Sequence, residues 1–146
     1  MKLSNRLFRI LDQYKIAMTQ HFRAQQIALS PLHYKVLQLI HALDPATPQL
    51  IAQRSGRDKA QVTRLLQEME KQGLIEKRPH PTDRRSICLA LTPLACERVS
   101  QGEQEAARLD ERLCSLLTPA EIAQLQQLLD KIDRKSTRLN SSHDQR

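Results

Sequence analysis

Four of the seven prolines in this chain directly follow a serine or a threonine, in the pairs Ser30-Pro31, Thr47-Pro48, Thr92-Pro93 and Thr118-Pro119. Such a pair marks a helix start, because the hydroxyl can accept a backbone N–H of the first turn and proline lacks only an N–H that has no partner there. Glu121 completes a capping box with Thr118. Asp58, followed by Gln61, predicts a fifth helix start, and Gly73 predicts a helix end. The chain is therefore predicted to be mainly helical.

Apolar periodicity predicts the elements between these marks. Stripes with helical spacing predict helices after Pro119 and over residues 3–25, 31–43, 48–55, 59–72 and 93–117. Two short runs, 74–78 and 86–91, alternate as strands do, and the second places Ile87, Leu89 and Leu91 on one face. Residues 79–83 between them are rich in turn formers. The predicted fold class is mainly α with a small β-hairpin.

The helix at 93–117 carries a seam in which apolar or small residues recur at alternating steps of four and three, as in a coiled coil. Its positions are Ala95, Val99, Gly102, Ala106, Leu109, Leu113 and Leu116. A similar stripe runs along the first helix, from Leu3 to Phe22. The seam either packs only on terminal helices of its own chain or serves a second copy. We favour a homodimer, because apolar stripes at both chain ends exceed what so small a domain buries.

The formal net charge of +7 is unevenly distributed. Residues 53–85 hold nine Lys and Arg against five Asp and Glu, whereas residues 86–133 hold four against eight. A local basic segment suits a polyanion, although a solvated surface of mixed charge explains such a run equally well. All Phe and Tyr residues lie before residue 35, so the basic segment lacks the aromatic platform on which single-stranded nucleic acids stack.

Several classes of protein find no support. The three glycines are too far apart for a phosphate-binding loop, and no motif joins a nucleophile, a base and an oxyanion donor, so neither an enzyme nor a cofactor is expected. The five histidines lack metal-ligand spacing, so no metal is expected. The sequence shows no membrane-spanning run and no signal peptide, and its odd number of cysteines suits a reducing compartment. We expect a cytoplasmic, nucleoid-associated protein.

Four stretches resemble the MarR/SlyA family of winged helix-turn-helix transcription factors. They are LSPLHYKVL at residues 29–37, IAQRSGRDK at 51–59, the run 61–75, and the run 83–95, which fits the wing signature D-x-R-x5-L-T-x-x-G. The resemblance spans about residues 3–133. Ala95 replaces the usual Gly, and Ala60 replaces a common Ser or Thr. Ser55 replaces the usual Leu, which predicts a looser turn.

The resemblance implies a domain organisation. A winged helix-turn-helix DNA-binding domain would cover residues 31–92, with an N-terminal dimerisation helix in 1–30 and C-terminal dimerisation helices in 93–134. Residues 135–146 have no apolar period and resemble translated vector sequence. We expect them to form a disordered tail, either native or foreign.

The expected recognition helix begins at Lys59 and enters the DNA major groove with its N-terminus first. Arg binds guanine and Gln binds adenine through paired hydrogen bonds, so Gln61 and Arg64 are expected to contact bases. Lys59 and Thr63 are expected to contact the DNA backbone, although Lys59 could be merely solvated and Thr63 could pack inside. Arg57, just before this helix, is expected to contact DNA as well.

The resemblance implies that Arg85 enters the minor groove while a salt bridge to Asp83 holds it. A narrow minor groove concentrates negative potential around such a guanidinium group. The alternative is an exposed surface pair with little energetic value. Arg84 completes the expected DNA-binding residues.

The resemblance also implies a small phenolic or anionic effector that releases the DNA. Its candidate contacts are His21, Phe22, His33 and Tyr34, each with the alternative of an ordinary packed or half-exposed helix residue. Redox sensing is a less favoured alternative. Cys96 and Cys114 would lie about 27 Å apart along one helix, too far for an intrachain disulfide.

These observations predict a homodimeric, sequence-specific regulator of transcription that binds a palindromic double-stranded operator as a repressor. The alternatives are a low-specificity DNA-coating or counter-silencing protein, a redox-responsive regulator, and a protein-interaction module. The pair Gln61 and Arg64 with the Asp83–Arg85 motif favours the first prediction, because an interaction module has no need of them.

Overall fold

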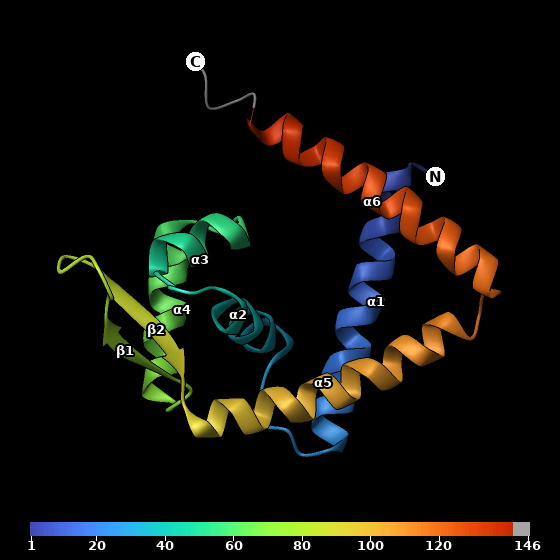
Figure 1. The fold of residues 1–146 in the computed structure, drawn as a ribbon. Helices are drawn as coiled ribbons and strands as arrows, with labels where there is room; N and C mark the ends of the chain where they lie inside the picture. The colour runs from blue at the N-terminus through green and yellow to red at the C-terminus, as the bar shows by residue number, and fades with distance from the viewer. Residues whose placement is uncertain (142–146) are drawn as a thin grey trace. The chain divides into compact units, whose positions relative to one another are not determined.

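The computed structural model describes residues 1–141, which form six helices and one antiparallel hairpin (Figure 1). In chain order the elements are α1 Leu3–Ala24, α2 Pro31–Ala42, α3 Pro48–Ser55, α4 Lys59–Lys71, β1 Ile75–Pro79, β2 Ile87–Leu91, α5 Pro93–Cys114 and α6 Pro119–Ser141. This order confirms the predicted fold class, mainly α with a small β-hairpin. We call β1, β2 and the loop 80–86 between them the wing.

Hydroxyl caps fix the helix starts as predicted. Ser30 and Thr47 each accept the backbone N–H three residues further on, at 3.1 and 3.2 Å. Thr118 and Glu121 form the reciprocal capping box, each accepting the other's backbone N–H. Asp58 is at the N-cap of α4, but its carboxylate accepts no backbone N–H. The predicted cap is therefore wrong: the Asp58 side chain is exposed, so water can satisfy the first N–H groups of α4.

An apolar core holds α2, α3, α4 and the wing together. Its fully buried side chains include Leu37, Ile51, Val62, Met69 and Leu74. Burying each large apolar side chain contributes about 1.5–3 kcal/mol to the free energy of folding. The segment between α2 and α3 is bonded to β2, since Leu89 N–H donates to the Ala46 carbonyl at 2.8 Å. The base of the wing is thus fixed to the helices beside it.

The hairpin pairs Ile75 with Leu91 at its base and Pro79 with Ile87 near its tip. Pro79 was predicted to be loop, but it ends β1, where a strand tolerates a residue without an N–H. Ile87, which was predicted to share one face with Leu89, is 40% exposed, whereas Leu89 is buried. The reason is its position at the start of β2, next to the wing loop and away from the core.

In the compact unit formed by residues 1–106, three helices meet around Gly102 of α5. The rings of Phe22 (α1) and Tyr34 (α2) pack edge to face, with centroids 5.6 Å apart, and both touch the space beside Gly102. His21 Nδ1 lies 3.1 Å from the carboxylate of Glu105, which is 4% exposed. Gly102, a small residue of the predicted seam, therefore leaves space for two aromatic rings of the same chain.

The seam divides into two parts. Ala95, Val99 and Gly102 are buried, which fits packing within the chain, whereas Leu113 and Leu116 are exposed. The stripe on α1 divides in the same way: its C-terminal residues are buried, and Leu3, Leu7, Phe8 and Ile10 are exposed. The second unit, residues 107–146, exposes Leu125, Leu129 and Ile132 on α6.

The helix α6 is longer than predicted. It runs to Ser141, so residues 135–141 are helical, although the sequence predicted a disordered tail from residue 135. Residues 135–141 contain no proline or glycine, the two residues that most strongly interrupt a helix. Residues 142–146 of the expected tail lie outside the described residues.

Candidate nucleic-acid interface

The turn between α3 and α4 is held by Gly56 and Ser55. Gly56 adopts φ 64°, a left-handed conformation that suits glycine because it has no Cβ. Ser55 Oγ donates to the Ala52 carbonyl at 3.2 Å and accepts the Arg57 N–H at 3.4 Å. The Ser55 hydroxyl thus contributes two hydrogen bonds to the turn that the usual Leu could not form, and the looser turn stays a prediction. This turn sets the direction in which α4 leaves α3.

The first two turns of α4 expose the residues expected to contact DNA. Its buried residues recur along one side, so Lys59, Gln61 and Arg64 are exposed to solvent. Thr63 is exposed too, which excludes the alternative that it packs inside. Its hydroxyl donates to the Lys59 carbonyl at 2.9 Å, so in this structure it offers a neighbour its methyl group and its oxygen lone pairs. Of these four residues, Lys59 and Arg64 supply positive charge.

The wing loop shows a different role for Asp83 from the expected one. Asp83 Oδ1 accepts the backbone N–H of Arg85 at 2.9 Å, and the Asp83 carbonyl accepts the Ser86 N–H at 3.2 Å. Among the ion pairs of residues 1–135 none joins Asp83 to the Arg85 guanidinium, so the expected salt bridge is replaced by a turn. An aspartate readily bonds its own backbone two residues on, without ordering a long arginine side chain.

His80 is a wing residue that the sequence did not single out. Its Nδ1 accepts the backbone N–H of Asp83 at 2.9 Å and that of Thr82 at 3.2 Å. The backbone N–H of His80 donates to the Ser86 carbonyl at 3.4 Å, which closes the loop. The sequence did contain a signal for this role, namely a polar side chain just before a turn whose backbone N–H groups have no strand partner. The residues that usually accept such N–H groups are Asn, Asp and Ser, not His.

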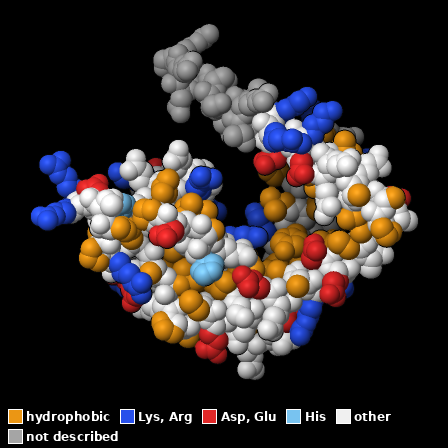
Figure 2. Space-filling view, viewed as in Figure 1, with side chains coloured by type: hydrophobic (Ala, Val, Ile, Leu, Met, Phe, Trp, Pro, Cys, Tyr) orange, Lys and Arg blue, Asp and Glu red, His pale blue; other side chains and the backbone are white. Residues whose placement is uncertain are grey.

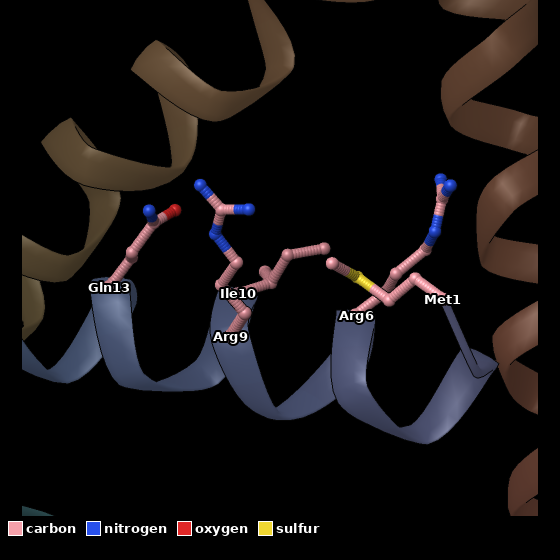
Figure 3. A pocket seen from close by; sticks show the side chains of 5 residues that line it. All are labelled: Met1, Arg6, Arg9, Ile10 and Gln13. Atoms are coloured by element: carbon pink, nitrogen blue, oxygen red, sulfur yellow. The ribbon is translucent and has the colours of Figure 1, made fainter.

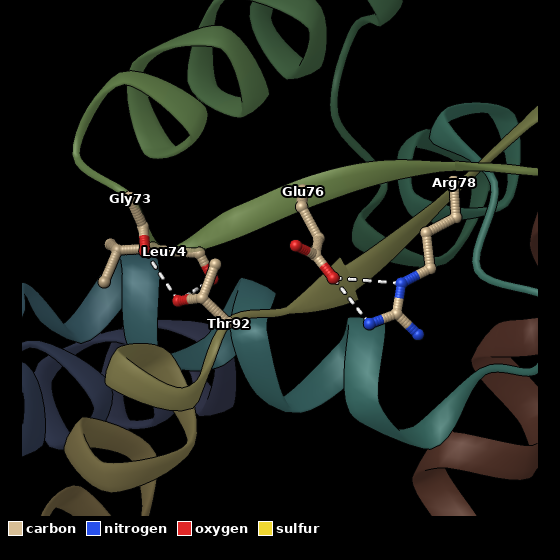
Figure 4. A network of polar contacts seen from close by, with 5 residues as sticks. All are labelled: Gly73, Leu74, Glu76, Arg78 and Thr92. Atoms are coloured by element: carbon tan, nitrogen blue, oxygen red, sulfur yellow. Dashed lines mark hydrogen bonds and ion pairs between the residues drawn. The ribbon is translucent and has the colours of Figure 1, made fainter.

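The basic residues near the hairpin differ in whether they are paired. Lys77 Nζ lies 3.4 Å from the Glu70 carboxylate, and Arg78 pairs with Glu76 on the same strand (Figure 4). Within residues 1–135 the basic residues among the expected DNA contacts form no ion pair; they are Arg57, Lys59, Arg64, Arg84 and Arg85. Figure 2 shows Lys and Arg side chains projecting from the tip of the wing. Uncompensated positive charge is therefore placed at the start of α4 and at the wing tip.

Thr92 connects this surface to α5. Its hydroxyl donates to the carbonyl of Gly73, which follows α4, and accepts the Ala95 N–H of α5 at 3.2 Å (Figure 4). Its N–H donates to the Leu74 carbonyl at 3.1 Å. A single residue thus fixes the end of α4, the base of β1 and the first turn of α5 to one another.

The expected effector contacts are mostly packed. Phe22 and Tyr34 are 1% and 2% exposed, and His21 faces Glu105, while His33 is half-buried at the start of α2. In this structure the ordinary packed residue is the better description of Phe22 and Tyr34. Burial, with a smaller effect from Glu103, raises the pKa of the Tyr34 phenol above its usual value of 10.0.

Two surface hollows lie elsewhere. One, of about 480 Å³, is in the wing and is lined by Lys77, Arg78, Pro79, His80, Arg84, Ser86 and Ile87. The other, of about 410 Å³, lies along the first turns of α1 and is lined by Met1, Arg6, Arg9, Ile10 and Gln13 (Figure 3). Both combine guanidinium groups with apolar side chains, and neither includes an expected effector contact.

The described residues show no group of three or more His, Cys, Asp or Glu side chains that could hold a metal ion. Their helices are also too short or too polar to cross a lipid bilayer. The three cysteines are free: Cys88 is buried, Cys96 is exposed, and Cys114 is half-buried.

Comparison with known proteins gives consistent similarities. The model of the MarR family matches residues 29–87. The multiple antibiotic resistance protein MarR of Salmonella typhimurium is 29% identical over 128 residues, which cover 87% of this chain and 88% of that protein. A protein assigned to regulation of the hcr operon of Thauera aromatica is 28% identical over 75% of this chain, which spans 66% of the relative's length.

Solved structures bound to DNA are similar as well. The transcriptional repressor CouR, bound to a 23-mer DNA duplex, is 25% identical with a TM-score of 0.79, covering 90% of this chain and 92% of that chain. A single-site mutant of MarR from E. coli, in complex with operator DNA, is 25% identical with a TM-score of 0.75, covering 88% of this chain and 91% of that chain.

Proposed function

We propose that this chain is a member of the MarR family of winged-helix transcriptional regulators and that it acts as a homodimeric repressor of a palindromic operator. The match to the MarR family model and the similarity to MarR of Salmonella typhimurium support DNA binding and regulation of transcription. One observation carries the finer proposal: the unpaired basic residues of the interface gather at the exposed start of α4 and at the wing tip. Positive charge at the start of α4 suits a helix that lies in the major groove, and positive charge at the wing tip suits a loop that enters the minor groove.

In the proposed complex, α4 lies in the major groove and the wing reaches the adjacent minor groove. Gln61 and Arg64 contact base edges, because they are exposed on the first two turns of α4. Lys59 and Arg57 contact phosphates, and Thr63 contacts a thymine methyl or the DNA backbone. Arg84 and Arg85 enter or flank the minor groove, while Asp83 shapes the loop that carries them.

The apolar surface of the terminal helices supports a homodimer. Residues on the N-terminal part of α1 and along α6 expose large apolar side chains that this chain alone leaves uncovered. A stable dimer buries about 1,200–2,000 Å² of total surface, for which such residues are suitable. We accordingly propose that residues 1–30 and 93–134 supply the dimer helices, and residues 31–92 the DNA-binding domain. Two α4 helices related by a two-fold axis would read half-sites about one helical turn apart.

The repressor role and an effector complete the proposal. CouR, which is similar over most of this chain, is a transcriptional repressor. We propose that a small phenolic or anionic compound lowers DNA affinity and acts near His21, Phe22, His33 and Tyr34. Because Phe22 and Tyr34 pack beside Gly102, such a compound would reach them only where α1, α2 and α5 separate. Its addition should release the bound operator.

Selection of bound duplexes from a random pool, followed by footprinting on the selected sequence, tests the function. We expect a palindrome with two half-sites, and light scattering should give twice the chain mass without DNA and two chains plus one duplex with DNA. A specificity ratio near one between selected and random duplexes would instead indicate a DNA-coating protein. A monomer bound to a single half-site would contradict the dimer. Neither outcome depends on identifying the effector.

A further inference from the structure

We infer that His80 is a positioning residue for DNA binding, whose unprotonated Nδ1 holds the wing loop in the shape that presents Arg84 and Arg85. This inference rests on the proposed contact between the wing and DNA. It also predicts that the affinity for DNA decreases when His80 is protonated. His80 itself need not touch the DNA.

The geometry assigns the protonation state of the ring. Nδ1 accepts the N–H groups of both Thr82 and Asp83, at 3.2 and 2.9 Å, and a ring nitrogen that accepts carries no hydrogen. The proton of the neutral ring is therefore on Nε2. Pro79 and Pro81 flank His80, so neither neighbour can donate a backbone N–H in place of these two. One ring atom thus satisfies two successive N–H groups of the loop.

His80 and Asp83 divide the backbone of the loop between them. His80 holds the N–H groups of residues 82 and 83, and Asp83 holds those of Arg85 and Ser86 through its carboxylate and its carbonyl. Arg84 and Arg85 lie in the part of the loop whose backbone these four hydrogen bonds fix. Their side chains are exposed and form no ion pair within residues 1–135, so the backbone sets where their guanidinium groups begin.

Protonation of the ring would oppose this arrangement. An imidazolium carries hydrogen on both nitrogens, so Nδ1 would point an N–H at two other N–H groups and the loop would have to rearrange. Histidine is the side chain that ordinarily changes charge between pH 5 and 8. The charged groups around the ring are Lys77 and Arg78 of β1, Arg84 of the loop, and the neighbouring Asp83.

Simple charge predicts the opposite result. A positive histidine beside the DNA backbone would add attraction to phosphate and tighten binding as the pH falls. The positioning role predicts weaker binding, because the loop that carries Arg84 and Arg85 loses its shape. The direction of the pH effect at this one residue therefore distinguishes the two roles.

The test uses the full chain and the duplex obtained by selection, with affinity measured by fluorescence anisotropy at pH 7.5 and 5.5 and constant ionic strength. The variants are His80→Ala, His80→Asn, Arg85→Ala and, as a matched control at an exposed position of α2, His41→Asn. Asparagine can accept backbone N–H groups in a turn but does not titrate. Thermal unfolding of each variant checks that it is folded.

At pH 7.5 we expect His80→Ala to weaken binding about 3- to 10-fold, as loss of such hydrogen bonds implies, and His80→Asn to bind within about twofold of the unchanged chain. On going to pH 5.5, the unchanged chain and His41→Asn should lose more affinity than His80→Asn does. The inference is overturned if His80→Ala binds normally, if asparagine fails to rescue, or if His80→Asn has the same pH dependence as the unchanged chain.

The Arg85→Ala variant separates this inference from the proposed function. If Arg85→Ala weakens binding and His80→Ala does not, the wing contacts DNA and only the role of His80 is wrong. If Arg85→Ala binds normally, the wing makes no energetic contribution, and both the wing contact and the inference are wrong.

Discussion

Gly102 on α5 lies so close to Tyr34 on α2 that a Cβ added at Gly102 would be 2.8 Å from Tyr34 Cε2. The same Cβ would be 3.2 Å from Phe22 Cζ on α1. Both contacts involve ring atoms, and both rings are almost fully buried, so neither ring can move away freely. The approach of three helices in this part of the protein therefore depends on the absence of a side chain at one position.

Gly102→Ala should destabilise the protein, although alanine is the better helix former by about 1 kcal/mol. Overpacking of a filled core costs about 1–3 kcal/mol, which exceeds that gain when aromatic rings must shift. The measurement is urea unfolding followed by circular dichroism. Gln101→Ala, at the exposed position just before Gly102, is the control and should change stability little. A Gly102→Ala variant more stable than the unchanged chain would show that the rings adapt at no cost.

Thr92→Val should lower the free energy of unfolding by about 1–2 kcal/mol, because it removes a helix cap and a hydrogen bond while nearly keeping the side-chain shape. The hydroxyl otherwise joins Gly73 to the first turn of α5. Thr92→Ser keeps the hydroxyl and should retain most of the stability, as read from urea midpoints. A loss in Thr92→Ser without a loss in Thr92→Val would assign the effect to the methyl group and not to the cap.

The Tyr34 phenol predicts an alkaline loss of stability. Its pKa is raised by burial, then by Glu103 and Tyr14, above the value of about 10 that the unfolded chain should show. Because the folded state holds the proton more tightly, its contribution to stability is complete below about pH 10 and is lost as the pH rises through the folded pKa.

Unfolding free energies between pH 9 and 11 measure this effect against Tyr34→Phe. The variant also loses the 2.8 Å hydrogen bond from Gln38, so the slopes with pH are compared and not the absolute values. The unchanged chain should show the steeper decline above about pH 10. Parallel slopes would mean that Tyr34 has the same proton affinity in the folded and unfolded states.

Local signals in the sequence were sufficient for most of the fold. The caps at Ser30, Thr47 and Thr118 form with residues three positions away, so these interactions are local and can be predicted from the sequence. The helical period of α4 likewise separated its buried residues from its exposed ones. Asp58 shows the limit of such signals, since its side chain leaves the expected cap unmade.

The parts of the site that were not predicted depend on geometry that the local sequence does not determine. An Asp-x-Arg motif allows the carboxylate to bind either the guanidinium or the backbone N–H two residues on, and in this turn Asp83 accepts the backbone N–H of Arg85. His80 acts through a ring nitrogen in a role that usually falls to other residues. Phe22 and Tyr34 are core residues because α5, distant in the sequence, brings Gly102 against them.

The variants Arg64→Ala and Arg85→Ala test whether α4 and the wing read DNA together. The measurement is the affinity of the full chain for the selected palindrome and for random duplex, with Arg112→Ala as an exposed control that removes the same charge elsewhere. Each interface variant should lose about tenfold or more in affinity for the palindrome while unfolding normally. Arg112→Ala should bind like the unchanged chain. If the interface variants lose no more affinity than Arg112→Ala does, or if the palindrome is bound no better than random duplex, α4 and the wing do not read DNA together.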